Sequence, residues 1–287
     1  MRLNHNMQSL SVFRNYKNHI SKNSSALEKI STGSKINSSK DNPVKLGQSE
    51  SLRMQIRGLQ SAQRNVQDGV SMLQTADTAL DTVGQVILRM KELTVQAGND
   101  TNTEEDRKTI QKEIDQLKSY IDQTASNTEF NGNKLLGAEG VTNNDYPNYK
   151  YMQCGAMSEE EIRIPMFNIS TLSLKDDNGN VLKDIDVTRS DNIDKALNVI
   201  DNSLKTVNNC RSKYGSIQQR MESTADNINQ NFSSLEKAES NVRDADLALE
   251  MAEFSRTSIL KDTATALLQQ TNNFPKDMLS ILQNMRK

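Results

Sequence analysis

Apolar residues recur every three or four positions along most of this 287-residue chain. The clearest run comprises Leu52, Ile56, Leu59, Ala62, Val66, Val70, Leu73, Ala76, Leu80, Val83, Ile87 and Met90. This period predicts a long α-helix with one narrow apolar face. Such a face is buried by a neighbouring helix rather than by a thick core, so the chain is expected to form a helical bundle.

Two more helices are expected to complete this bundle. Thr103 is predicted to cap a helix with acidic residues in its first turn and an apolar stripe at Ile110, Ile114, Leu117 and Ile121, ending before Asn131. The longest stripe runs from Leu197 to Ala252 at roughly 3.4 residues per apolar position, close to the spacing of a left-handed coiled coil. The fold class predicted is mainly α, an elongated antiparallel helical bundle or coiled coil.

The segment 131–191 has a different character. Residues 149–154 and 161–164 are predicted to be short strands, and the Asn178-Gly179 pair predicts a turn. We therefore expect a β-hairpin insert of about 50–60 residues, too small for an independent enzymatic domain.

The two ends carry thin apolar stripes that cannot build a core alone. They are expected to pair with each other, to be partly disordered in the monomer, and to become ordered on self-assembly. The candidate assembly residues are Leu3, Met7, Leu10, Phe13, Ile20, Leu27, Ile259, Leu260, Leu267, Leu268, Leu279 and Leu282.

Composition excludes several classes of function. Hydrophobic residues make up 34% of the chain and the net charge is −2, so neither a membrane span nor the basic face of a nucleic-acid binder is expected. The N-terminus lacks the apolar stretch of a cleavable secretion signal. No metal or cofactor is implied by His5 and His19, and Cys154 and Cys210 are either isolated apolar fillers or, if the fold brings them together, a disulfide.

Several sequence blocks resemble the bacterial flagellins. They are residues 23–41 (with Gly33-Ser34-Lys35-Ile36-Asn37), 54–59, 68–77, 129–136 (with Asn131-Gly132-Asn133), 244–250 (with Asp244-Ala245-Asp246), 259–260, 266–272 and Pro275. They occur in the family's order and span roughly four-fifths of the chain. Shared helical periodicity alone would not reproduce these Asn-Gly, Asp-Ala-Asp and Gly-Ser-Lys-Ile-Asn blocks.

The resemblance implies a chain folded back on itself in two layers. Residues 1–42 would form the N-terminal part of the inner D0 core and its spoke, and residues 242–287 the C-terminal part. Residues 43–130 and 192–241 would form the D1 helices, and residues 131–191 the β-rich insert with a reduced variable region.

The function implied is a structural, non-enzymatic subunit of the extracellular flagellar filament, exported through the flagellar channel without a cleaved signal. Its implied partners are further copies of itself, an export chaperone at the C-terminal segment, and hook-associated and cap proteins at the filament ends. The alternative is a hook–filament junction protein of the same apparatus. An enzymatic flagellin would need a His-Glu-x-x-His motif, which the sequence lacks.

Two sets of surface residues follow from the resemblance. Recognition by the animal Toll-like receptor for flagellin would involve Arg89, Leu93 and Gln96, spaced to share one helical face, together with Glu113. Candidate O-glycosylation sites in the insert are Ser170, Thr171, Ser173, Thr188 and Ser190.

Overall fold

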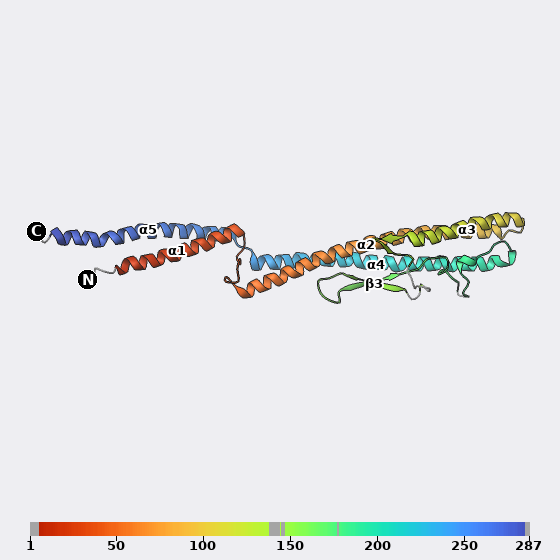
Figure 1. Cartoon of the computed structure of the whole chain (residues 1–287), viewed down its shortest axis with the longest axis horizontal. Helices are drawn as coiled ribbons and strands as arrows, with labels where there is room; N and C mark the ends of the chain where they lie inside the picture. The colour runs from red at the N-terminus through yellow and green to blue at the C-terminus, as the bar shows by residue number, and fades with distance from the viewer. Residues whose placement is uncertain (1–5, 138–143, 145–146, 177, 285–287) are drawn as a thin grey trace. The chain divides into compact units, whose positions relative to one another are not determined.

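The computed structural model describes residues 6–137, 144, 147–176 and 178–284 (Figure 1). The helices are α1 (Met7–Thr32), α2 (Pro43–Ala97), α3 (Glu104–Asn127), α4 (Ile193–Arg243) and α5 (Leu247–Asn284). The strands are β1 (Glu129–Phe130), β2 (Asn133–Lys134), β3 (Asn148–Gln153) and β4 (Glu161–Met166), and two short 3-10 turns, η1 (Leu182–Asp184) and η2 (Ser190–Asn192), follow β4. The mainly α fold with a small β insert is therefore confirmed.

The chain divides into two compact units. The terminal unit comprises Met1–Ile56 with Ser234–Lys287, and the bundle unit comprises Arg57–Ser233. Each unit brings together segments that are distant in the sequence.

In the bundle unit, the apolar stripes of three helices turn inward. The core side chains that are less than 2% exposed include Leu73, Leu80, Val83, Ile87 and Met90 of α2, Ile114 and Ile121 of α3, and Ile200, Val207 and Met221 of α4. Ion pairs join Lys91 to Asp201 at 2.6 Å and Arg211 to Asp77 at 3.0 Å, so α2 and α4 run antiparallel. The antiparallel bundle predicted from the stripes is confirmed.

The turn between α2 and α3 also agrees with the sequence. Thr103 forms a capping box, in which the Asp106 N–H donates to the Thr103 hydroxyl at 3.2 Å and the Thr103 N–H donates to the Asp106 carboxylate at 3.0 Å. These bonds satisfy N–H groups that the first turn of a helix leaves unpaired, and so they place the start of α3 at Glu104.

Two helix boundaries differ from the apolar pattern. Helix α2 begins at Pro43, well before the stripe at Leu52, because the Asn42 side chain accepts from the Lys45 N–H at 3.0 Å and proline suits the first helical position. The stripe from Leu197 to Ala252 is not one helix, because α4 ends at Arg243. The Asp246 carboxylate then accepts from two N–H groups of the first turn of α5.

The insert is a pair of hairpins packed on the bundle. Strands β3 and β4 pair antiparallel, as expected, with Tyr151 opposite Arg163. Strands β1 and β2 flank Asn131 and Gly132, both with positive φ (50° and 75°), as tight hairpins require.

Polar contacts fasten the later part of the insert to α3. The Thr171 hydroxyl donates to the Asp122 carboxylate at 2.8 Å, and the Lys118 ammonium donates to the Ile185 carbonyl oxygen at 2.8 Å. The Phe167 ring packs against the ring of Tyr214 of α4 at a centroid distance of 5.2 Å, with the two ring planes tilted by 55°. The insert is therefore part of the bundle unit rather than a separate domain.

In the terminal unit, α1 and α5 pack against each other in antiparallel fashion, which confirms the predicted pairing of the two ends. A short β-bridge joins Ser34 to Asp244 where these helices meet the rest of the chain. The Lys35 N–H donates to the Arg243 carbonyl oxygen at 2.6 Å, and the Ala245 N–H donates to the Gly33 carbonyl oxygen at 2.9 Å. Gly33 has φ of 66°, which allows the chain to turn sharply at the end of α1.

Candidate assembly surface of the paired terminal helices

The paired terminal helices leave large apolar side chains in contact with water. These outer apolar residues, 40–71% exposed, are Met7, Leu10, Phe13, Ile20 and Leu27 of α1, and Leu247, Leu249, Met251, Ile259, Leu267 and Phe274 of α5. Monomeric proteins rarely carry so extensive an exposed apolar surface, which indicates a surface that another protein covers.

Most of the predicted assembly residues belong to this set. Leu260 and Leu268 are half-buried beside it. Leu3 lies outside the described residues, as do the side chains of Leu279 and Leu282 in the last turns of α5. Sequence reasoning omitted Leu247, Leu249, Met251 and Phe274 from its assembly residues, although all four are 50–66% exposed.

The contact between α1 and α5 is polar along much of its length. The Asn6 side-chain amide donates to the Thr271 carbonyl oxygen at 2.8 Å, and the Ser9 hydroxyl donates to the Asn272 side chain at 2.9 Å. Toward the other end of α1, Asn23 contacts Thr257 at 3.1 Å, and the Lys29 ammonium pairs with the Glu250 carboxylate at 3.0 Å. We call these eight residues the polar seam.

Sequence reasoning missed the polar seam because it followed apolar residues only. The spacing of polar residues could have predicted it. Ser9 and Asn23 stand fourteen residues apart, which is two heptads, and therefore lie on one face of α1. On α5, Glu250 and Thr257 stand seven apart.

A second polar cluster lies beside the β-bridge of the terminal unit. The Arg243 guanidinium donates to the Glu50 carboxylate at 3.0 Å and to the Ser49 hydroxyl at 3.4 Å, and the Ser49 hydroxyl donates to Glu239 at 3.1 Å. The hydrogen bond from Arg243 is the main reason that the pKa of Glu50 is lowered. Arg243 thus joins α2 and α4 through its side chain and receives the Lys35 N–H through its carbonyl oxygen.

The candidate receptor-binding residues lie in the bundle unit. The Arg89 guanidinium pairs with Glu92 at 3.0 Å and with Glu113 at 3.1 Å, and these two carboxylates raise its pKa. Arg89, Gln96 and Glu113 are exposed, whereas Leu93 is only 2% exposed and belongs to the bundle core. The structure therefore brings three of the four residues to one surface.

The candidate glycosylation sites differ in their access to solvent. Ser190 is exposed, and Ser170 and Thr188 are half-buried. Thr171 and Ser173 are buried, and the Thr171 hydroxyl is occupied by Asp122. Ser190 is thus the most accessible of the five hydroxyl groups.

Cys154 and Cys210 are both buried and neither is in a disulfide, which agrees with their interpretation as apolar fillers and overturns the alternative of a disulfide. Burial also raises the pKa of the Cys154 thiol. A thiol in such surroundings is not a reactive nucleophile.

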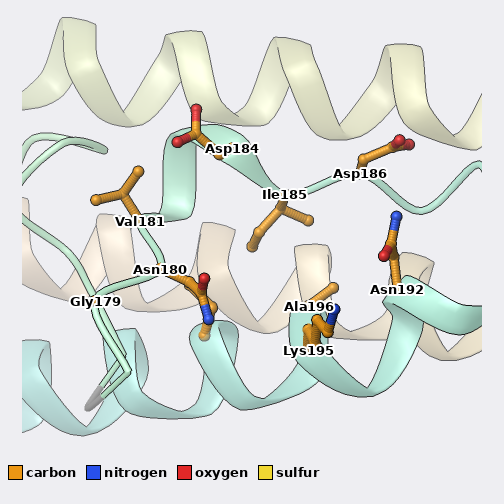
Figure 2. Close-up of a pocket in the computed structure, with 10 residues that line it drawn as sticks. Gly179, Asn180, Val181, Asp184, Ile185, Asp186, Asn192, Lys195 and Ala196 are labelled. Carbon is orange, nitrogen blue, oxygen red and sulfur yellow. The ribbon is translucent and has the colours of Figure 1, made fainter.

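A pocket of about 230 Å³ lies between residues 179–186 of the insert and the start of α4 (Figure 2). Ile185 and Ala196 contribute apolar groups, and Asp184, Asp186 and Lys195 add charge. Among the described residues, no cluster of three or more His, Cys, Asp or Glu side chains could hold a metal ion, and no helix could cross a membrane.

The chain matches known flagellar proteins along its whole length. The family models of the bacterial flagellin N-terminal and C-terminal helical regions match residues 3–140 and 197–282. The flagellin of Halalkalibacterium halodurans is 38% identical over 283 residues, covering 99% of this chain and 100% of the relative. The flagellin of Bacillus subtilis is 36% identical over 305 residues, with 99% and 100% coverage.

More distant matches extend the comparison. The flagellar filament 33 kDa core protein of Treponema phagedenis is 34% identical over 288 residues, covering 99% of this chain and 100% of the relative. The solved structure of a putative flagellar hook-associated protein from Vibrio parahaemolyticus shares the fold, with a TM-score of 0.60, 14% identity, and coverage of 71% of this chain and 100% of that one. The family models and the full-length relatives together show that this chain belongs to the bacterial flagellin family.

Proposed function

We propose that this flagellin is the subunit of an extracellular flagellar filament and that it polymerises through the outer apolar residues of α1 and α5. This proposal rests on the observation that eleven large apolar side chains of the terminal unit are 40–71% exposed. The names of its relatives, which include flagellar filament core proteins, support the same role.

Burial of the outer apolar residues between subunits would favour assembly. Burying one large apolar side chain completely is worth roughly 1.5–3 kcal/mol, so covering the exposed half of eleven contributes on the order of 10 kcal/mol. Ordering the helices and side chains opposes part of this gain. A surplus of several kcal/mol per subunit contact is enough for a stable polymer.

Seeded elongation tests the proposal. Purified monomer with Phe13→Ser or Ile259→Ser is mixed with short filament fragments, and filament length is measured by negative-stain electron microscopy. Each variant is expected to elongate at least about tenfold more slowly, while the far-ultraviolet circular dichroism of the monomer is unchanged. Lys17→Ser, an exposed polar site on α1, is the matched control.

Two outcomes would contradict the proposal. If Phe13→Ser elongates at the wild-type rate, the outer apolar residues are not the assembly surface. If the wild-type protein stops at short oligomers, a hook–filament junction protein becomes the better assignment.

We infer that recognition by the Toll-like receptor uses the exposed surface of Arg89, Gln96 and Glu113. Leu93 would act from the core by supporting the Arg89 backbone rather than by direct contact. Arg89→Ala and Glu113→Ala are expected to reduce receptor signalling by monomer, whereas Arg64→Ala, an exposed arginine of the same helix, serves as the control. Unchanged signalling by both variants would refute this role.

The C-terminal segment is the proposed binding site of the export chaperone, because α5 alone presents six of the outer apolar residues. A chaperone that covers them keeps the subunit monomeric until export without a cleaved signal. Hook-associated and cap proteins would meet the same surface at the filament ends. Calorimetric titration of the chaperone against wild type and Phe274→Ser tests this, with weaker binding expected for the variant.

Surface glycosylation is proposed at Ser190, the exposed candidate hydroxyl of the insert. Intact mass of native protein should exceed the 32.2 kDa of the sequence, and Ser190→Ala should remove the excess. A native mass equal to the sequence value would contradict the modification.

A further inference from the structure

The polar seam and the outer apolar residues are parallel stripes on the same two helices. On α1, Ser9, Tyr16 and Asn23 stand seven residues apart and face α5, half-buried. Phe13, Ile20 and Leu27 also stand seven apart, four positions further along, and are 40–53% exposed. At about 100° per residue, these stripes are separated by only about 40° around the helix.

Helix α5 repeats the arrangement. Glu250, Thr257 and Ala264 stand seven apart and are 0–7% exposed against α1. Leu260 lies three positions after Thr257 and is half-buried, and Leu267 lies three positions after Ala264 and is 44% exposed. A small rotation of either helix would therefore move its polar-seam residues out of the contact and bring the neighbouring apolar stripe into it.

We propose that the polar seam positions α1 against α5, fixing both the rotation and the register of the helix pair so that the outer apolar residues stay available to the next subunit. The seam residues are thus positioning residues for assembly, and they act through the apolar side chains beside them. This inference rests on the proposed assembly function.

The most buried members of the seam make other arrangements unfavourable. Glu250 has a side chain only 9% exposed, and its carboxylate is paired with Lys29 at 3.0 Å. Thr257 is fully buried and accepts a hydrogen bond from Asn23, whose amide also donates to the Phe254 carbonyl oxygen at 3.2 Å. A slipped or rotated α1 would leave the Glu250 carboxylate against the helix without its partner, which is strongly unfavourable.

Polar residues within helix pairs are known to select register even when they reduce stability. The four contacts run from the N-cap of α1 at Asn6 through Ser9 and Asn23 to Lys29 in its last turn, so they hold both ends of the helix. An apolar seam would pair equally well in several registers, because hydrophobic contacts are not directional.

Cross-linking of the full-length monomer tests the register directly. Ser9→Cys with Asn272→Cys reports the observed register, because the two side chains are in contact at 2.9 Å; it replaces one of the four seam contacts and leaves the other three in place. Ser9→Cys with Lys276→Cys reports a slip of one turn. Both native cysteines are buried, so their thiols should not take part in the cross-link under native conditions. Oxidative cross-links are then identified by peptide mapping.

Charge reversal provides the variants and their rescue. Lys29→Glu or Glu250→Lys alone is expected to reduce the in-register cross-link, and the seeded elongation rate, about tenfold, and the double variant should restore both to within about twofold. Lys17→Glu is the matched control. Asn23→Leu should lose the in-register cross-link while retaining its helicity.

Unchanged in-register cross-linking in both single variants, or failure of the double variant to restore it, would overturn the proposal. The cross-link is measured in monomer without filament seeds. It therefore separates the two ideas: if charge reversal changes the register as expected while Phe13→Ser elongates normally, the assembly surface is wrong and the polar seam stands.

Discussion

The bundle unit and the terminal unit use the same apolar periodicity in opposite ways. In the bundle unit, Leu80 and Ile87 of α2 are 0% exposed. In the terminal unit, Phe13 of α1 and Leu267 of α5 keep nearly half of their surface in water, and the contact between the helices includes polar pairs such as Lys29 with Glu250.

The difference comes from the number of elements available to cover a stripe. In the bundle unit, α2 is covered by α3 and α4 as well as by the insert, which contacts Gly69 through Met152. The terminal unit has two long helices, and a pair of helices covers only one face of each. The same apolar spacing therefore gives buried helix faces in the bundle unit and exposed apolar faces in the terminal unit.

The largest expected contrast between the two units is in stability. Leu80→Ala should lower the free energy of unfolding of the monomer by about 2–5 kcal/mol, because it opens a cavity in a closed core. Leu267→Ala removes the same atoms from a half-exposed site and should lower it by less than about 1 kcal/mol. Urea denaturation followed by circular dichroism measures both values.

Equal losses from the two leucine variants would mean that the terminal unit has its own closed core. The rate of seeded elongation should rank the two variants in the opposite order to their stabilities. Leu267→Ala is expected to slow elongation more than Leu80→Ala does at a temperature where both monomers are folded.

Periodicity predicted the long helices of the bundle and much of its core. The stripe from Leu52 to Met90 and the cap at Thr103 are both found in the structure, because helical spacing and capping are local properties of the sequence. The apolar stripe did not predict the end of α4 at Arg243, because the apolar pattern continues past this residue. The break is set by the Asp246 cap and by the hydrogen bond from Ala245 to Gly33.

The candidate sites were predictable only in part, because exposure depends on distant segments. Leu93 shares a helical face with Arg89 by spacing, yet it is buried, since the bundle covers one flank of that face. Thr171 is closed off by Asp122, 49 residues earlier in the chain. The polar seam depends on pairs such as Lys29 and Glu250, which are 221 residues apart.

The next largest contrast appears at alkaline pH. Tyr214 is buried in the bundle unit, and burial, followed by the nearby Cys210, raises its pKa. The pKa of a tyrosine in the unfolded chain is near 10. Because the pKa of Tyr214 is higher in the folded protein, its contribution to the free energy of unfolding is fully present below pH 10. Above that pH the contribution falls by up to about 1.4 kcal/mol per pH unit.

Tyr214→Phe removes this titration, so its stability should fall less than that of the wild type between pH 9 and pH 11, as followed by urea denaturation at each pH. Tyr120→Phe, at a tyrosine 46% exposed, is the matched control and should follow the wild type. A parallel decline of the wild type and the Tyr214 variant would show that Tyr214 is already ionised or solvated in the folded protein.

Helix caps offer a smaller contrast. Thr103→Ala deletes the capping box of α3 and should cost about 1 kcal/mol in global unfolding, because α3 belongs to the closed bundle. Asn6 caps α1 by accepting from the Ser9 N–H at 3.1 Å, and it also bonds to Thr271. Asn6→Ala should therefore leave global unfolding nearly unchanged and increase amide hydrogen exchange in the first turns of α1.

The smallest effect expected is a stabilisation, and it tests whether the two units unfold together. Gly47 of α2 lies in the terminal unit and Gly215 of α4 in the bundle unit, and a Cβ added at either would meet no atom within 4 Å. Alanine at each site should favour the helix by about 0.5–1 kcal/mol. If the bundle controls global unfolding, only Gly215→Ala raises the urea midpoint, whereas Gly47→Ala slows hydrogen exchange locally. Equal shifts of the urea midpoint would instead mean that the terminal unit unfolds cooperatively with the bundle unit. The two units would then differ in the exposure of their apolar side chains but not in stability.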